Sequence, residues 1–171
     1  SINKTLKLIA GPKTDFIVNN VCLNETHILT NTSIGDNITN YSWDFGDLKT
    51  SNDPNTSHKY DTAGTYLVTL TAQNQEGCIS PISKNITTHK LPKAQFENDL
   101  SCSNLGTSFF DESISLNGSI NKHFWTIQNQ NYTTANHIHV FDKAQSFNVK
   151  LKIETEFGCL DSLTQNITVL Q

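Results

Sequence analysis

The chain has 171 residues, of which 36% are hydrophobic and 16% charged, and its formal net charge is -4. This length suits one large domain or two domains of ordinary size. Only 12 residues are Lys or Arg, and nucleic acids and anionic membrane surfaces both require clustered cations, so neither partner is expected.

The amino-terminal run SINKTLKLIAGP lacks the long apolar core of a signal peptide. No other stretch approaches the roughly 20 consecutive apolar residues that span a bilayer. We therefore expect no membrane insertion, and a chain that is mature or excised from a longer protein.

Short strands separated by turns are predicted along the whole chain. Tyr41, Trp43 and Phe45 alternate with other residues at the period of two that marks a half-buried strand. Residues 66–72 and 147–153 alternate in the same way, and turn formers such as SIGDN, SNDPN and DTAG separate these runs. No window sustains the apolar stripe of a helix, so the predicted fold class is all-β with a sandwich architecture.

An internal repeat determines the predicted organisation. The run GPKTDFIVNNVCLN at 11–24 reappears as LPKAQFENDLSCSN at 91–104, an offset of 80. Further on, EGCISPISKNITTH at 76–89 matches FGCLDSLTQNITVL at 157–170, an offset of 81. Two tandem β-sandwiches account for this pattern better than one large domain.

The predicted domain boundaries are 1–90 and 91–171. By the offset of 80, residues 5–11 lie over residues 85–91, the expected last strand of the first copy. Residues 1–11 are therefore either the last strand of an upstream repeat or the opening strand of the first copy, and the sequence leaves both alternatives open.

The run WDFGD at 43–47 is interpreted as a structural motif. Trp43 shares a strand face with Phe45 and is expected to bury its large apolar area between the sheets. Asp44 then points to the opposite face. Gly46 permits the backbone conformation needed to leave the strand, and Asp47 can accept hydrogen bonds from amides of the following turn.

This run, with His58 and Tyr60 in an H-x-Y pattern and Tyr66 in a G-x-Y-x-V-x-L strand, resembles the polycystic kidney disease (PKD) domain family. The resemblance covers about 80 residues of the first copy. In the second copy Trp125 is followed by Thr-Ile-Gln-Asn instead, so the family is extended there through the repeat. Leu48 stands where the family usually has glycine.

The resemblance implies immunoglobulin-like sandwiches displayed outside the cell. Such domains are similar to the tandem repeats of bacterial surface and gliding-motility adhesins of Bacteroidetes type, and to modules beside the catalytic domains of secreted hydrolases. Further repeats of the same polypeptide are therefore expected as neighbours.

The acidic residues of the motif are candidates for catalysis or for calcium binding. Asp44 and Asp47 are a carboxylate pair, but acid/base catalysis requires two carboxyls facing one cleft, which the end of a strand in a small sandwich does not offer. We expect no enzyme activity. Calcium at Asp44, Asp47 or Asp53 suits oxygen ligands better, although the dense D-x-D-x-D spacing is missing, so no cofactor is expected and calcium is the one candidate.

Two histidines form a further candidate metal site. His137 and His139 are two positions apart, so their imidazoles share one face of a strand and could chelate a transition metal, but no third ligand is evident. His58 aligns with His139 at the offset of 81. A histidine at the same place in both copies favours packing or a hydrogen bond at the strand edge, and no metal site is predicted.

The four cysteines indicate an oxidising compartment, because they are even in number, widely spaced and free of metal-binding patterns. Cys22 and Cys78 are 56 positions apart, and Cys102 and Cys159 are 57 apart. We expect one disulfide within each copy, clamping one end of each sandwich and worth about 4 kcal/mol in the chain-entropy model.

The predicted function is a non-catalytic extracellular spacer or adhesion module of a larger bacterial cell-surface protein. Its expected partners are extracellular or cell-surface proteins and glycans. The alternative is a glycan- or protein-binding accessory module of a secreted hydrolase, for which an exposed aromatic such as Tyr132, in the expected loop NQNYTT, would provide a stacking surface.

Overall fold

The computed structural model describes residues 10–171, and the chain forms two compact units, Ser1–Thr88 and His89–Gln171. The strand expected over residues 1–11 falls mostly on residues 1–9, outside those described. Within residues 10–171 there are fifteen strands and no helix, which confirms the predicted all-β class. Accordingly, that part of the chain holds no helix long and apolar enough to cross a membrane.

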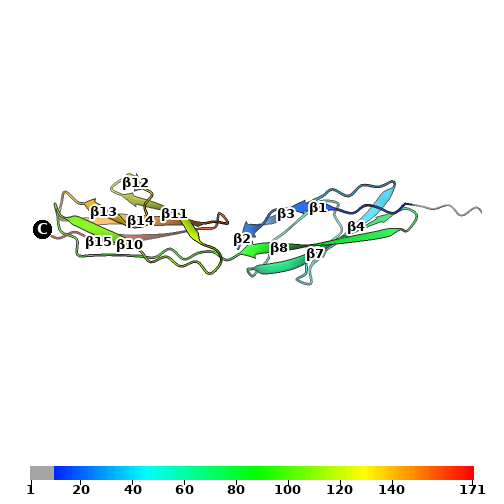
Figure 1. Ribbon diagram of the computed structural model, residues 1–171, viewed down its shortest axis with the longest axis horizontal. Helices are drawn as coiled ribbons and strands as arrows, with labels where there is room; N and C mark the ends of the chain where they lie inside the picture. Colours follow the sequence, from blue (N-terminus) through cyan, green and yellow to red (C-terminus); the bar gives the residue numbers. More distant parts are fainter. Residues whose placement is uncertain (1–9) are drawn as a thin grey trace, which may run out of the picture. The chain divides into compact units, whose positions relative to one another are not determined.

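Unit 1 is built from two sheets that form the layers of a sandwich (Figure 1). Their orders are β2-β8-β7-β4-β5 and β1-β3-β6. The strands are β1 (Phe16–Val18), β2 (Val21–Cys22), β3 (His27–Asn31), β4 (Ile38–Asp44), β5 (Thr50–Ser51), β6 (Thr56–His58), β7 (Gly64–Asn74) and β8 (Ile79–His89).

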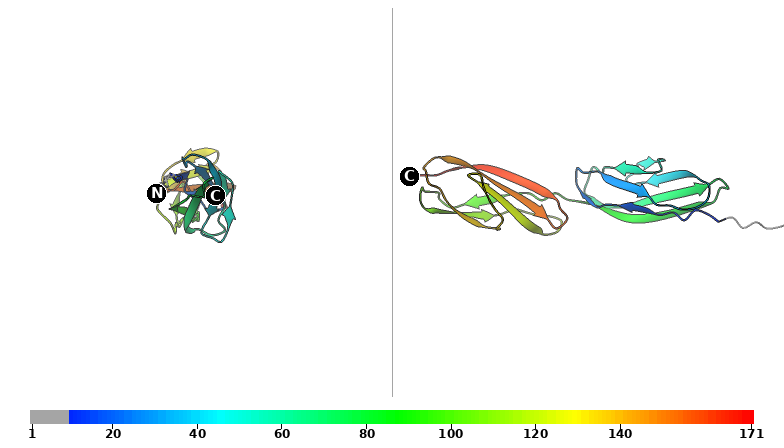
Figure 2. Two further views of the ribbon diagram at one scale, coloured as in Figure 1. Left: turned by 90° about the vertical axis from the view of Figure 1, so that its right-hand side faces the viewer. Right: turned by 90° about the horizontal axis from the view of Figure 1, so that it is seen from above.

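Unit 2 repeats this plan, as the further views of Figure 2 also show. Its sheet orders are β12-β11-β14-β15 and β13-β10-β9. The strands are β9 (Phe96–Asn98), β10 (Gly106–Asp111), β11 (Ile120–Ile127), β12 (Gln130–Tyr132), β13 (His137–Val140), β14 (Ser146–Thr155) and β15 (Leu160–Thr168).

The core of each unit lies between its two sheets. In unit 1, Trp43 of β4 is fully buried and packs edge-on against Phe16 of β1, with ring centroids 5.1 Å apart. In unit 2, Trp125 of β11 does the same with Phe96 of β9 at 5.0 Å. Each tryptophan thereby joins the larger sheet of its unit to the smaller one.

The long strands show why alternation builds this core. Along β7, Val68, Leu70 and Ala72 are buried, whereas Leu67, which precedes them, is 56% exposed. Along β14, Val149, Leu151 and Ile153 are buried and the lysines between them point away. Successive side chains of a strand point to opposite faces, so one face meets the facing sheet and the other meets solvent.

Candidate functional site

The candidate site is the end of unit 1 that carries the WDFGD run. The indole Nε1–H of Trp43 donates a 2.9 Å hydrogen bond to the carbonyl oxygen of Asp53, and Asp44 Oδ1 accepts a 2.9 Å bond from the Gly46 amide. Gly46 has φ of +76°, and a Cβ there would lie 2.8 Å from the carbonyl oxygen of Leu67. Both the left-handed backbone and this close approach require glycine.

Asp47 leaves this turn toward the histidine of β6. The Nε2–H of His58 donates a 2.8 Å hydrogen bond to Asp47 Oδ2, and the amide of Lys49 donates to Asp47 Oδ1 at 3.2 Å. Burial of the carboxyl opposes its ionisation, but these two hydrogen bonds, together with the charges of His58 and Lys49, hold the pKa of Asp47 below its ordinary value. The His58 ring stacks flat on Phe45, with centroids 4.1 Å apart.

Tyr60 lies under this pair and fastens it to the core. Its hydroxyl donates a 2.7 Å hydrogen bond to the carbonyl oxygen of Phe45, and its ring stacks on Tyr66 with centroids 3.6 Å apart. Burial raises the pKa of the Tyr60 phenol well above its ordinary value, so the hydroxyl remains a donor. The residues of the motif therefore form one connected cluster of hydrogen bonds and stacked rings.

Unit 2 builds the same cluster from different chemistry. The Nε2–H of His139 donates to Gln128 Oε1 at 2.9 Å, so a neutral amide stands where unit 1 has Asp47. Phe141 stacks on Phe147 with centroids 4.8 Å apart, in the place of the two tyrosines. The indole of Trp125 donates to the carbonyl oxygen of Thr134 at 3.0 Å.

The three carboxylates considered as calcium ligands make hydrogen bonds to nearby groups of the chain. The Asp44 and Asp47 carboxylates accept hydrogen bonds within their own turn, and Asp53 Oδ2 accepts one from the Ser51 hydroxyl at 3.2 Å. Within residues 10–171, no group of three or more His, Cys, Asp or Glu side chains is arranged to hold a metal ion.

The aromatic expected in a loop of unit 2 belongs to a strand. Tyr132 ends β12 and is half-buried, and its ring stacks on His137 with centroids 3.7 Å apart. Burial lowers the pKa of His137, and burial together with the charge of His137 lowers that of His139. The predicted loop at Tyr132 is therefore wrong, because this residue pairs with Trp125 as part of β12.

The cysteines correct the predicted pairing. Cys22 and Cys159 are disulfide-bonded, whereas Cys78 and Cys102 are free thiols. The predicted bridges Cys22–Cys78 and Cys102–Cys159 are therefore absent from the part of the chain that the structure describes.

The physical reason is the direction of the strands within each unit. Strand β2 lies beside the end of β8, where Asn20 Oδ1 accepts a hydrogen bond from the Thr87 amide, but Cys78 precedes the start of β8. Thr87 lies nine positions beyond Cys78, which is about 30 Å of strand. A disulfide requires Cα atoms within about 7 Å, so the two cysteines of unit 1 cannot meet.

Unit 2 has the same geometry. Cys102 forms a β-bridge with Leu170, beyond the end of β15, whereas Cys159 precedes the start of that strand. Cys159 and Leu170 are eleven positions apart, which spans roughly 35 Å of strand. The nearly equal spacings of the cysteines suggested one bridge in each unit, but in each unit the two cysteines lie at opposite ends of the sandwich.

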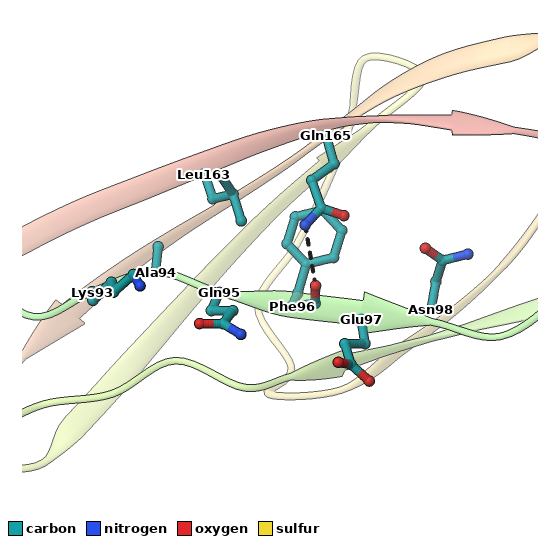
Figure 3. A pocket seen from close by; sticks show the side chains of 8 residues that line it. All are labelled: Lys93, Ala94, Gln95, Phe96, Glu97, Asn98, Leu163 and Gln165. Carbon is teal, nitrogen blue, oxygen red and sulfur yellow. Dashed lines mark hydrogen bonds between the residues drawn. The ribbon is translucent and has the colours of Figure 1, made fainter.

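The sequence did not predict one structural role, which belongs to Gln165 and Lys84. Gln165 of β15 donates a 3.3 Å hydrogen bond to the carbonyl oxygen of Phe96 on the free edge of β9, across an open groove of about 540 Å³ (Figure 3). In unit 1 the Lys84 ammonium donates to the carbonyl oxygen of Phe16 in the same way. Lys84 and Gln165 are aligned by the offset of 81, and each occupies an edge carbonyl that would otherwise be open to another strand.

Unit 1 also carries a second groove, of about 740 Å³, beside β4 and β7. Amide and hydroxyl side chains line it together with two isoleucines, a proline and one aromatic ring, that of Tyr41. The residues lining it are Ile38, Thr39, Asn40, Tyr41, Ser42, Asn52, Pro54, Thr71, Gln73 and Ile79. A groove of this size and composition can take a short segment of a polar polymer.

The first unit is similar to a known protein family. Residues 10–88 match the family model described as the PKD domain. Over 46 residues, 27% of this chain, the sequence is 46% identical to Collagenase ColA of Clostridium perfringens (strain 13 / Type A). That alignment spans only 4% of the collagenase.

Two solved structures are also similar. The PKD1 domain of the Vibrio cholerae metalloprotease PrtV is 31% identical, with a TM-score of 0.44, covering 46% of this chain and 98% of that one. Fibronectin(III)-like modules of Clostridium thermocellum CbhA are 10% identical, with a TM-score of 0.49, covering 94% of both chains.

Proposed function

We propose that the chain is a non-catalytic extracellular module of a larger protein, where it spaces neighbouring domains and presents surfaces to extracellular or cell-surface proteins and glycans. The observation that carries this proposal is that the polar groups of the matched motif are engaged with each other. Asp44 bonds Gly46, Asp47 bonds His58, and Tyr60 bonds the Phe45 carbonyl. Such a cluster supports a fold instead of a reaction.

The extracellular or cell-surface location rests on two observations. Cys22 and Cys159 are disulfide-bonded, and such bonds persist in oxidising compartments. The PKD domain match over residues 10–88 adds the family context. The parent protein would then be a bacterial surface protein with tandem repeats, of which the gliding adhesins of Bacteroidetes type are the proposed example.

The second candidate is an accessory module that holds a secreted hydrolase on its polymer. It is favoured by the 46% identity to a segment of a collagenase and by the groove beside β4 and β7. In either role the module works without a cofactor, so calcium is proposed not to bind at Asp44, Asp47 or Asp53.

Binding of residues 1–171 to insoluble polymers distinguishes the two candidates. We expect no binding to fibrillar collagen, cellulose or chitin at protein concentrations up to about 100 µM in co-sedimentation assays. Micromolar binding to one polymer would replace the spacer by the accessory role, provided that Asn40→Ala and Gln73→Ala in the groove weaken it. Asn148→Ala, on an exposed face of unit 2, is the matched control.

A further inference from the structure

The repeat divides the four cysteines into two classes. Cys22 and Cys102 occupy the same position at an offset of 80, and Cys78 and Cys159 do so at an offset of 81. One member of each class, Cys22 or Cys159, is disulfide-bonded, and the other, Cys102 or Cys78, is a free thiol. Each free thiol therefore has a counterpart in the other unit whose chemistry is a disulfide.

The backbone that presents the hairpin class is the same in both units. The amide of Asn74 donates to the carbonyl oxygen of Cys78 at 3.1 Å, and the amide of Thr155 donates to that of Cys159 at 2.9 Å. The glycine before each cysteine has a left-handed φ, +86° in the first unit and +81° in the second. The thiol of Cys78 is thus held by the same turn that holds an oxidised cysteine in unit 2.

The other class also shares its local structure. The amide of Glu25 donates to the carbonyl oxygen of Cys22 at 3.0 Å, and the amide of Leu105 donates to that of Cys102 at 3.3 Å. The two cysteines differ in solvent exposure: Cys22 is 4% exposed, whereas Cys102 is only half-buried.

The hairpin class differs in the same direction. Cys159 is 1% exposed, and Cys78 is half-buried. In both classes the oxidised member is covered and the thiol is accessible to a partner. Neither thiol can bond the cysteine of its own unit, because strands of about 30 Å separate them.

We propose that Cys78 and Cys102 are the two complementary halves of a disulfide between copies, in which Cys78 of one copy bonds Cys102 of another. This pairs one cysteine of each class, one on each copy. The partner in the parent protein is a cysteine of the complementary class in another repeat, and a second copy of this chain is the probe for it. The proposal assumes the oxidising location inferred above but does not depend on the spacer or accessory role.

The bond forms by thiol–disulfide exchange with a small-molecule disulfide as the oxidant. The Cys78 thiolate attacks oxidised glutathione, forming a mixed disulfide and releasing one glutathione. The Cys102 thiolate of the second copy then attacks Cys78 Sγ and releases the second glutathione. Two protein thiols are oxidised, and one oxidised glutathione is reduced to two thiols.

Because Cys78 and Cys102 are different positions, this contact is heterologous and each copy keeps one reactive end. Purified chain incubated with oxidised glutathione should therefore give a ladder of dimers, trimers and longer species on non-reducing gels, which reductant collapses to monomer. Mass mapping should identify the Cys78–Cys102 peptide pair, with Cys22 and Cys159 still oxidised.

Two single variants make the test selective. Cys78→Ser alone and Cys102→Ser alone should each remain monomeric, whereas their equimolar mixture should give a dimer that stops at two copies. Far-UV circular dichroism checks that both variants fold. Homodimers formed by either variant as readily as the mixed dimer would overturn the proposal, as would a wild-type chain that ends as a monomer with both thiols glutathionylated. All of these outcomes are independent of the polymer-binding assay.

Discussion

His58 and Asp47 are joined by a 2.8 Å hydrogen bond from imidazole Nε2–H to carboxylate Oδ2, with side chains only 9% and 16% exposed. The hydrogen bonds that Asp47 accepts hold its pKa below the ordinary value despite burial. In the unfolded chain the same carboxyl has the ordinary aspartate pKa of about 3.9. The ionised group therefore stabilises unit 1 fully above the unfolded pKa, and this contribution is lost as pH falls through the folded pKa.

The free energy of unfolding of unit 1 falls as the pH is lowered from about 5 to about 2. We predict that this fall is smaller in Asp47→Asn than in the unmodified chain. Hydrogen-exchange mass spectrometry at several pH values measures this, with peptides of unit 2 as an internal reference because the substitution lies in unit 1. Asp61→Asn removes an 85% exposed carboxylate bonded to Lys49 and should leave the pH profile unchanged. Equal effects of both variants would contradict the role given to the buried pair.

Leu48 stabilises the fold less than glycine would. Its φ is +71° and its side chain is fully exposed, so it bears the left-handed strain without gaining burial. That conformation costs a residue with a Cβ roughly 1–2 kcal/mol, and glycine returns part of the gain through its freer unfolded chain. We predict that Leu48→Gly raises the free energy of unfolding of unit 1 by about 1 kcal/mol.

Denaturant unfolding followed by circular dichroism measures this gain. Leu100→Gly is the control, since Leu100 is 74% exposed and lies outside the positive-φ residues. It should bring no gain. A loss of stability in Leu48→Gly would show that the turn tolerates leucine without strain.

Gly46 and Gly77 separate backbone strain from steric contact. Both have positive φ, +76° and +86°, but a Cβ on Gly46 would meet the carbonyl oxygen of Leu67 at 2.8 Å, whereas on Gly77 it meets no atom within 4 Å. Gly77→Ala should therefore cost only the conformational penalty, about 1–2 kcal/mol. Gly46→Ala should cost at least about 2 kcal/mol more, because either β4 or β7 must shift. Thermal unfolding of the two variants in parallel checks the order, and equal costs would contradict it.

The sequence predicted the all-β class, and the long strands show why. Residues such as Val68 and Val149 follow a period of two that only a half-buried strand produces. The repeat offsets likewise brought His58 over His139, and the structure gives both histidines a hydrogen-bond partner across the turn. Local pattern is sufficient here because the side-chain direction along a strand is fixed by geometry.

The cysteine pairing could not be obtained in that way. Spacing gives the length of the loop between Cys22 and Cys78, but the end of the sandwich at which each lies depends on which strands are neighbours. The same limit applies to Tyr132, whose stacking partner His137 lies on β13 in the other sheet of unit 2. Long-range order of strands, and not local propensity, decides both.

Tyr60 and Tyr66 test how far the cluster depends on hydrogen bonding as opposed to ring packing. The Tyr60 hydroxyl donates to the carbonyl oxygen of Phe45 in a buried site, whereas the Tyr66 hydroxyl bonds Thr62 at the surface. Tyr60→Phe leaves that carbonyl buried without a donor, which costs about 1–3 kcal/mol. Tyr66→Phe should cost less than about 0.5 kcal/mol, because water replaces its partner. Urea denaturation of both variants measures the difference. Both variants keep their stacked rings, so the comparison tests the hydroxyl hydrogen bonds alone. Equal losses would mean that the Phe45 carbonyl finds another donor in Tyr60→Phe.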